Sequence, residues 1–236
     1  MKTALITGGT KGIGLGIAKA LIVDGVRVVI TGRKAEDTER VAEELNAEHE
    51  GMALGISCDV RSLKSQQECV AKTLEKWGGL DIVIANAGVG HFAHIADLTP
   101  EQWAETIDVN LTGVYNTIKA CLEPLKTSKG YFMTIASLAG ANFFAKGTAY
   151  NASKFGLVGF TQALMLDIRE FGIKTTTIMP GSVATYFNGH TPSAADDWKI
   201  QPEDIGQMVV DLLHIHPRTL PSKVEVRPTI PGGKKR

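Results

Sequence analysis

The sequence has few cysteines and lacks a long apolar run. Cys58, Cys69 and Cys121 are its three cysteines, and no two of them form a C-x-x-C pair. This spacing suggests neither a disulfide framework nor a zinc site, so we expect no metal. The apolar runs are interrupted well before the roughly 18 residues that a membrane span needs. The first residues enter a strand-like run without the layout of a signal peptide, so we expect a cytoplasmic protein without membrane contact.

The sequence also lacks an excess of charge of either sign. Its 25 Lys and Arg residues balance 25 Asp and Glu residues. A formal net charge of zero gives no general attraction to nucleic acid or to anionic lipid, so neither is expected as a partner. With 236 residues, 44% of them apolar, and no linker-like stretch, the chain is expected to form one α/β domain over residues 1–236. The basic stretch 231–236 is expected to be a frayed tail.

Short β-branched runs alternate with longer helical patterns along the chain. The predicted strands are Thr3–Thr7, Val26–Thr31, Met52–Ser57, Asp81–Ala85, Tyr131–Ala136, Lys174–Met179 and Lys223–Arg227. The predicted helices are Gly14–Asp24, Ala35–Ala47, Ser62–Trp77, Pro100–Leu125, Ala149–Phe171 and Pro202–His214. Nearly continuous apolar strands that alternate with helices predict a doubly wound, Rossmann-type α/β fold, with a seven-stranded parallel sheet and helices on both faces. Ligands are then expected beyond the carboxyl ends of the strands.

Tyr150 and Lys154 are spaced i, i+4 at the start of a predicted helix, so both fall on one helix face. A phenol with a pKa of about 10 is a poor acid or base at neutral pH. A lysine ammonium one turn away favours the phenolate and lowers that pKa, which would let the pair exchange protons near neutrality. Alone this motif is weak, because an exposed Tyr and a solvated Lys occur at this spacing by chance.

A glycine-rich turn joins the first predicted strand to the first helix. It reads Thr7-Gly8-Gly9-Thr10-Lys11-Gly12-Ile13-Gly14. Glycines allow a sharp turn and close approach of the backbone to a phosphate, and the helix N-terminus supplies N–H groups and positive potential. The spacing differs from G-x-G-x-x-G and is not a P-loop, because Gly-Lys-Ser/Thr does not follow. Its position between strand and helix favours dinucleotide binding over a plain tight turn.

The end of the second predicted strand indicates which dinucleotide binds. An acidic residue there binds the ribose hydroxyls of NAD, whereas an arginine binds the 2′-phosphate of NADP. The chain has Arg33, followed by Lys34, with no carboxylate at this place. Arg33 offers a two-pronged donor to phosphate, and Lys11 could add a second positive charge. NADP(H) is therefore the expected cofactor, although Arg33 as an ordinary solvated charge is the simpler alternative.

Taken together, these motifs resemble the short-chain dehydrogenase/reductase family, in its NADP-preferring form, over nearly the whole chain. The residues that carry the likeness are the loop from Thr7 to Gly14, Asp59, Asn86-Ala87-Gly88, Asn110, Ser137, Tyr150 with Lys154, and Pro180-Gly181. Each motif is modest alone, but their order and spacing are highly specific. The resemblance implies an oxidoreductase that transfers hydride between NADP(H) and a small carbonyl or alcohol substrate.

The resemblance implies a cofactor site along the edge of the sheet. Its members would be Gly8, Thr10, Lys11, Gly12, Ile13, Gly14 and Arg33 for the phosphates; Asp59 and Val60 for the adenine; Asn86, Ala87 and Gly88 for the ribose; and Pro180, Gly181, Val183 and Thr185 for the nicotinamide, with Tyr150 and Lys154 beside it.

The resemblance also implies four catalytic residues. Ser137 would hydrogen-bond the substrate carbonyl, and Tyr150 would give it a proton. Lys154 would hold the nicotinamide ribose and lower the Tyr150 pKa. Asn110 would kink its helix and hold a water that relays protons towards Lys154.

Residues of the substrate pocket are harder to identify from the sequence. His91 lies in the loop after Asn86-Ala87-Gly88, and the segment 185–200 has the composition of a substrate-binding lid. Phe144, Tyr186 and Phe187 are the aromatic candidates for an apolar pocket. In similar enzymes the two long helices pair across an interface, so the resemblance implies a homodimer or homotetramer.

Two other functions stay open. A 3-oxoacyl-thioester reductase of the same family is the first, although Phe171 stands where carrier-protein reductases often have a basic residue, and the usual Asp-Gly-Gly ending is absent. The second is a non-catalytic NADP-binding regulator, which the intact candidate catalytic residues disfavour. A reversible NADP(H)-dependent reductase of ketones or aldehydes is the leading hypothesis.

Overall fold

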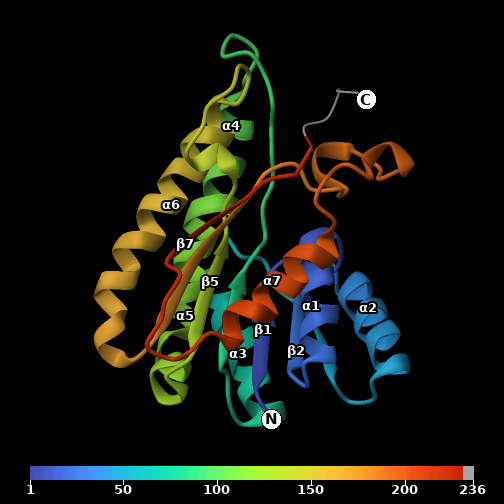
Figure 1. Ribbon diagram of the computed structural model, residues 1–236, viewed down its shortest axis with the longest axis vertical. Coiled ribbons are helices and arrows are strands. Elements are labelled where there is room, and N and C mark those ends of the chain that lie inside the picture. Colours follow the sequence, from blue (N-terminus) through green and yellow to red (C-terminus); the bar gives the residue numbers. More distant parts are fainter. Residues whose placement is uncertain (231–236) are drawn as a thin grey trace.

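The computed structural model describes residues 1–230 as one seven-stranded sheet covered by helices on both faces (Figure 1). The predicted tail, 231–236, lies outside the described residues. All neighbouring strands are parallel, and their order is β3-β2-β1-β4-β5-β6-β7. The order reverses direction between β1 and β4, and an open crevice is expected beyond the carboxyl ends at such a switch point. The predicted doubly wound fold is confirmed.

The central strands are apolar on both faces because both faces are covered. The strands are β1 (Thr3–Ile6), β2 (Arg27–Gly32), β3 (Ala53–Ser57), β4 (Ile82–Ala85), β5 (Tyr131–Ile135), β6 (Lys174–Pro180) and β7 (Lys223–Val226). Leu5 packs into the core on one side of the sheet, while its neighbours Ala4 and Ile6 pack on the other. Full burial of such a side chain stabilises the fold by about 1.5–3 kcal/mol.

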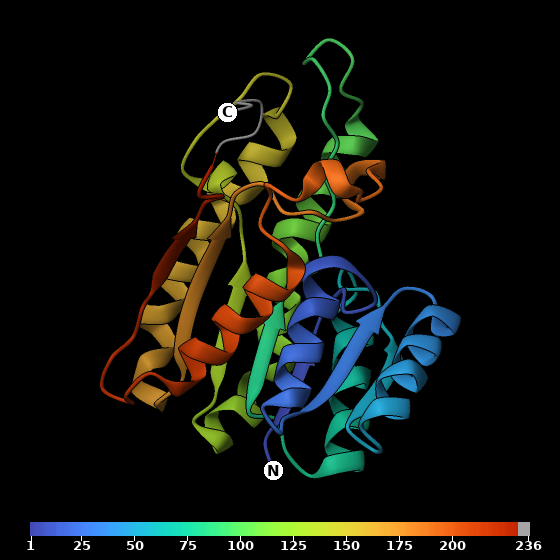
Figure 2. The same ribbon diagram turned by 45° about the vertical axis from the view of Figure 1, so that its right-hand side comes forward.

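Helices α1 (Gly12–Val23), α2 (Ala35–Glu48) and α7 (Pro202–His214) pack on one face of the sheet, and α3 (Leu63–Trp77), α5 (Gly113–Ser128) and α6 (Thr148–Ile168) pack on the other (Figure 2). Local signals set several ends. Ser62 caps α3 by accepting a hydrogen bond from the Ser65 N–H, and Gly78 ends it in a left-handed conformation. Within residues 1–230, no helix combines the length and the apolar content needed to cross a membrane.

The sequence predicts every strand boundary to within one residue, but the predicted helix Pro100–Leu125 is wrong in one respect. It is divided into α4 (Pro100–Ile107), a π-helical turn (Asp108–Thr112) and α5. The turn contains Asn110, whose side chain bonds the backbone of Val89 in a neighbouring segment. Periodicity alone does not report such a distant partner, although a kink at Asn110 was expected.

Candidate active site

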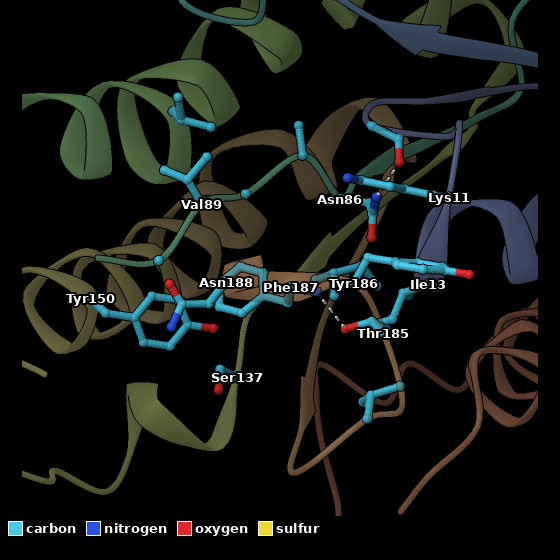
Figure 3. Close-up of a pocket in the computed structure, with 18 of the residues that line it drawn as sticks. Lys11, Ile13, Asn86, Val89, Ser137, Tyr150, Thr185, Tyr186, Phe187 and Asn188 are labelled. Atoms are coloured by element: carbon cyan, nitrogen blue, oxygen red, sulfur yellow. Dashed lines mark hydrogen bonds between the residues drawn. The ribbon is translucent and has the colours of Figure 1, made fainter. Parts of the chain in front are cut away.

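A cleft of about 1300 Å³ opens beyond the carboxyl ends of β1, β4, β5 and β6 (Figure 3). The first residues after these strands line it, among them Gly8, Asn86, Ser137 and Gly181. The segment 185–200 lies near the start of α1 in both ribbon views (Figures 1 and 2), and several of its residues, among them Thr185 and Phe187, line the cleft.

Most of the predicted site residues meet in this one cleft. Those that line it are Gly8, Thr10, Lys11, Gly12, Ile13, Arg33, Asp59, Val60, Asn86, Ala87, Gly88, His91, Ser137, Tyr150, Lys154, Pro180, Gly181, Val183, Thr185, Tyr186 and Phe187. Gly14, Asn110 and Phe144 are not among the lining residues, and each supports a residue that is.

The glycine loop is held against the end of β4 by two residues. The Asn86 side chain donates hydrogen bonds to the carbonyl oxygens of Thr7 (2.9 Å) and Gly8 (3.0 Å). The Thr7 hydroxyl accepts bonds from the backbone N–H groups of Asn86 and Ala87, each at 3.0 Å. A Cβ on Gly14 would lie 2.4 Å from the Gly8 oxygen, so only glycine fits beneath the loop. The loop is therefore fixed before any ligand arrives.

The start of α1 is suited to an anion. Lys11 is its N-cap residue, and within the described chain no side chain caps this helix end. The first N–H groups of the helix therefore have no partner from its own turns, and they face the cleft with positive potential. Gly8 and Gly12 have φ values of 64° and 55°, which glycine adopts without strain. These observations fit the phosphates of a dinucleotide.

Charged side chains surround the far end of the cleft, next to β2. The Arg33 guanidinium lies 3.9 Å from one oxygen of Glu105, and the other oxygen lies 2.8 Å from the Nε2 atom of His91. The sequence predicted neither contact, because Glu105 is on α4, far from Arg33 in the chain. The arginine side chain remains 64% exposed and is free to turn towards another anion.

Asp59 has a partner that the sequence analysis missed. Arg61 holds its carboxylate through Nε (3.0 Å) and Nη2 (2.6 Å), and these bonds keep the pKa of Asp59 below its usual value. The close sequence spacing of the two residues was the available signal. In the free protein this carboxylate is thus already engaged, although it was expected to receive the adenine amine.

Tyr150 and Lys154 lie one turn apart near the start of α6, as predicted. The Lys154 ammonium is buried, lies 5.7 Å from the centre of the Tyr150 ring, and donates a hydrogen bond of 3.0 Å to the Ile135 carbonyl. Burial lowers the Lys154 pKa to about 8. Ser137, at the end of β5, lies next to the phenol (Figure 3).

The expected lowering of the Tyr150 pKa is wrong for the free protein. Burial raises the pKa of the phenol, and the neighbouring Ser137 hydroxyl opposes that rise only in part. The i, i+4 spacing was correct, but the argument left out the removal of both groups from water. The Lys154 ammonium is itself destabilised by burial and is hydrogen-bonded to a carbonyl, so it stabilises the phenolate form of Tyr150 only weakly.

Asn110 joins three segments of the site. Its oxygen accepts a bond of 2.8 Å from the Val89 N–H, and its nitrogen donates to the Val89 carbonyl and to the Ser153 hydroxyl. The Ser153 hydroxyl in turn donates to the carbonyl of Tyr150. The side chain therefore holds the segment after β4 against α6. Its expected role in a water relay stays a prediction.

The nicotinamide end predicted from Pro180, Gly181, Val183 and Thr185 lies at the end of β6. The Gly181 N–H donates to the Val226 carbonyl of β7 (2.8 Å), and Val183 pairs with Ile200 in an isolated parallel bridge. Thr185 reaches the glycine loop, because a Cβ on Gly12 would lie 3.3 Å from its methyl group. The two halves of the expected cofactor site thus meet at Thr185.

The predicted substrate pocket residues do not all lie at one end of the cleft, and one further residue joins them. Phe187 lies beside Tyr150, and Tyr186 also lines the cleft, whereas His91 lines it at the end where Glu105 and Arg33 lie. Phe144 packs behind Phe92. Phe92 lines the cleft beside Tyr150 and was missed. Its position directly after His91, in a loop already expected to border the substrate, was the available signal.

A charged cluster fixes the shape of the segment 185–200. The buried carboxylate of Asp196 lies 2.7 Å from His190 Nε2 and 2.5 Å from Lys199 Nζ, and it accepts a bond from the Ser193 N–H. These partners keep the pKa of Asp196 well below its usual value. Within residues 1–230, no three His, Cys, Asp or Glu side chains gather as a metal site.

The chain is similar to known oxidoreductases in both sequence and structure. Residues 2–196 match the family model of the short chain dehydrogenases. An uncharacterised oxidoreductase of Staphylococcus saprophyticus is 34% identical over 96% of this chain and 97% of its own. An alcohol dehydrogenase from Thermococcus sibiricus, solved with 5-hydroxy-NADP, superposes with a TM-score of 0.92 at 30% identity and covers both chains fully. A 3-ketoacyl-(acyl-carrier-protein) reductase from Brucella melitensis, solved with NADH, gives a TM-score of 0.88 at 26% identity over 97% of each chain.

Proposed function

The chain belongs to the short chain dehydrogenase family and is an oxidoreductase, and from this premise we propose that it is an NADP(H)-dependent reductase of ketones or aldehydes. The reaction is reversible, so the same site oxidises the alcohol. One observation carries the proposal: Ser137, Tyr150 and Lys154 meet on one wall of a cleft that also contains the open N-terminus of α1.

Ser137 and Tyr150 act on the substrate carbonyl. The Ser137 hydroxyl donates a hydrogen bond to the carbonyl oxygen and holds it next to the phenol. Since burial raises the Tyr150 pKa, the phenol is protonated at neutral pH and is ready to donate its proton to that oxygen. When bound, the reduced nicotinamide supplies the hydride to the carbonyl carbon. The free protein therefore holds this phenol in the form that reduction of a carbonyl requires.

Lys154 positions groups around the phenol. Its stem packs within α6, and its ammonium, already bonded to the Ile135 carbonyl, has further donors for the ribose hydroxyls of a cofactor. Asn110 holds the segment of Val89 in place through two hydrogen bonds to its backbone. Gly88 lies between Asn110 and Lys154, since a Cβ on Gly88 would lie 3.4 Å from the Asn110 oxygen and 3.8 Å from the Lys154 nitrogen. The residues at this end thus orient the reacting groups.

The charges near β2 support NADP(H) as the cofactor. Arg33, Lys34 and Lys11 line the cleft there, with Asp37 and Glu105 as the opposing acids. Arg33 is exposed and only weakly held by Glu105, so its guanidinium can form a two-pronged bond to a 2′-phosphate. The Thermococcus sibiricus structure with 5-hydroxy-NADP is in line with this choice, whereas the Brucella melitensis structure with NADH keeps NAD(H) open as a second cofactor.

The segment 185–200 serves as a substrate-binding lid in this proposal. It carries Tyr186 and Phe187 into the cleft, and its shape depends on the contacts of Asp196 with His190 and Lys199. The cytoplasmic location and the homodimer or homotetramer expected from the sequence stay predictions. Light scattering of the purified protein tests the second.

A 3-oxoacyl-thioester reductase is the alternative enzyme, supported by the likeness to the Brucella melitensis reductase. The deciding experiment follows NADPH and NADH oxidation with simple ketones, aldehydes, diketones and a 3-oxoacyl thioester. Turnover of free carbonyls with NADPH supports the proposal, and a strong preference for the thioester replaces it with the alternative. NADPH binding without any turnover would leave the non-catalytic regulator.

A further inference from the structure

Two phenylalanines from separate segments pack against the proposed proton donor. Phe92 comes from the segment after β4, and Phe187 from the segment 185–200. The ring centre of Tyr150 lies 5.3 Å from that of Phe92, with the planes at 76°, and 5.6 Å from that of Phe187, with the planes at 56°. The centres of Phe92 and Phe187 are 6.2 Å apart. We call Phe92, Tyr150 and Phe187 the aromatic wall.

The aromatic wall presents uncovered apolar surface at the substrate end of the cleft. All three of its residues line the cleft, and Phe92 is 38% exposed. Phe144 packs edge-on behind Phe92, with ring centres 5.7 Å apart, and supports it from the far side. Aromatic edges and faces at these distances attract a further ring in the same edge-to-face manner. The wall therefore suits a planar apolar group better than a polar chain.

Gly90 allows the wall to form. A Cβ at this position would lie 2.6 Å from two atoms of the Phe187 ring and 3.1 Å from the Phe92 ring. Any side chain at Gly90 would overlap the Phe187 ring. The ring would then have to move, and it would lose its contacts with Phe92 and Tyr150.

Two basic side chains of the segment 185–200 are already paired with an acid. His190 and Lys199 line the cleft and share the carboxylate of Asp196. A substrate carboxylate or phosphate would have to separate one of these pairs to gain a partner there, and it would add a negative charge beside Asp196. This arrangement favours an uncharged substrate.

We propose that the aromatic wall selects uncharged carbonyl compounds with an aromatic ring attached to the carbonyl, that is, aryl ketones and aryl aldehydes. This inference rests on the proposed carbonyl reduction and specifies its substrate. The ring packs on Phe92 and Phe187, and the attached carbonyl then lies within reach of Ser137 and Tyr150. Phe92 and Phe187 are specificity-determining residues.

The test compares two ketones of similar size with NADPH: phenyl methyl ketone and cyclohexyl methyl ketone. The Phe92→Leu variant keeps the apolar volume and removes the ring, so the ratio of the two kcat/KM values, phenyl over cyclohexyl, should fall roughly five- to tenfold. Phe143→Leu is the matched control, because Phe143 neighbours Phe144 but is 86% exposed; its ratio should equal that of the wild type. Phe187→Leu carries the same test if Phe92→Leu does not fold.

A third ketone, 4-acetylbenzoate, tests the charge argument on the wild-type enzyme. It should be reduced at least tenfold less efficiently than phenyl methyl ketone. The inference is overturned if the folded leucine variant keeps the wild-type ratio, or if 4-acetylbenzoate is reduced as well as the neutral ketone. Reduction of cyclohexyl methyl ketone in those cases leaves carbonyl reduction standing, whereas no turnover of any ketone or aldehyde overturns the proposed function itself.

Discussion

The ammonium of Lys154 lies 5.7 Å from the centre of the Tyr150 ring, and its hydrogen bond goes to the Ile135 carbonyl rather than to the phenol. Burial acts on both groups in the same sense, since it disfavours the charged form of each. In the free protein the pair is therefore a neutral phenol beside a weakened ammonium. The first three predictions below follow from this arrangement.

Tyr150→Phe should lower kcat for ketone reduction by about 10²–10⁴-fold, because it removes the proton donor and keeps the ring in the aromatic wall. The NADPH dissociation constant, measured by cofactor fluorescence, should stay within about twofold of the wild type, since the hydroxyl contributes little cofactor contact area. Full activity in this variant would show that another group donates the proton.

The efficiency of reduction should depend on pH through Lys154. Its pKa of about 8 means that the ammonium is charged below this pH and becomes neutral above it. Because the charged form has more donors for a bound ribose, kcat/KM for NADPH should be level at lower pH and fall as the pH rises through about 8. A profile measured on both sides of this value checks the prediction, and a level profile up to the pKa of a free lysine would contradict it.

Lys154→Met should stabilise the protein while it removes activity. The folded pKa of about 8 lies below the ordinary 10.5, so the unfolded state binds more protons between these values and stability rises with pH across that window. Below about pH 8 the buried charge costs on the order of 3 kcal/mol, and methionine does not carry this cost. Urea unfolding at neutral pH measures the gain, with Lys119→Met, an exposed lysine on α5, as the control. A loss of stability would show that the bond to Ile135 outweighs desolvation.

Arg33 and Glu105 should act in opposite directions on cofactor choice. Arg33→Ala removes a charged donor to phosphate, so NADPH binding should weaken about 10- to 100-fold while NADH binding changes little. Glu105→Gln frees Arg33 from an exposed ion pair worth at most about 1 kcal/mol, so NADPH should bind up to about fivefold tighter. Titrations of both cofactors measure these effects, with Glu101→Gln on the same helix as the control. Equal changes for NADPH and NADH would contradict the role of Arg33 as a phosphate ligand.

Asp196→Asn should loosen the segment 185–200. The substitution keeps the shape of the side chain but removes the charge that holds His190 and Lys199. Because the pKa of Asp196 is lowered by these partners, the wild-type contacts persist above the ordinary value of 3.8 and are lost only as the pH falls further. Limited proteolysis at neutral pH should cut the variant several-fold faster within this segment. Asp197→Asn, an exposed neighbour, should behave as the wild type.

The strands, the helices and the parallel sheet could be predicted from the sequence because they depend on local patterns. Runs such as Leu5-Ile6 are apolar throughout because both faces of the sheet are covered, and this signal lies within a few residues. The glycine loop, Ser137 and the pair of Tyr150 and Lys154 follow strand ends or share a helix face. Topology then brings them together without further information.

What the sequence did not supply are contacts between residues far apart in the chain. Glu105 binds Arg33 across the cleft, and Phe92 meets Phe187 only when the segment 185–200 is folded. The prediction that the Tyr150 pKa is lowered was wrong for a related reason. The pKa of the phenol depends on how far the surrounding segments exclude water from it, and the i, i+4 spacing does not report this exclusion.

The π-helical turn at Asp108–Thr112 also sets the rotational phase of the helix that follows it. One additional residue in a turn rotates everything beyond it by about 100° around the helix axis. The turn therefore lets α4 and α5 point different faces inward, so that α5 directs Val114, Ile118 and Cys121 at the sheet while Asn110 faces the cleft segment. Deletion of a single residue here would restore a regular α-helical turn and rotate the apolar side of α5 out of the core. The length of this turn is thus as constrained as the identity of its asparagine.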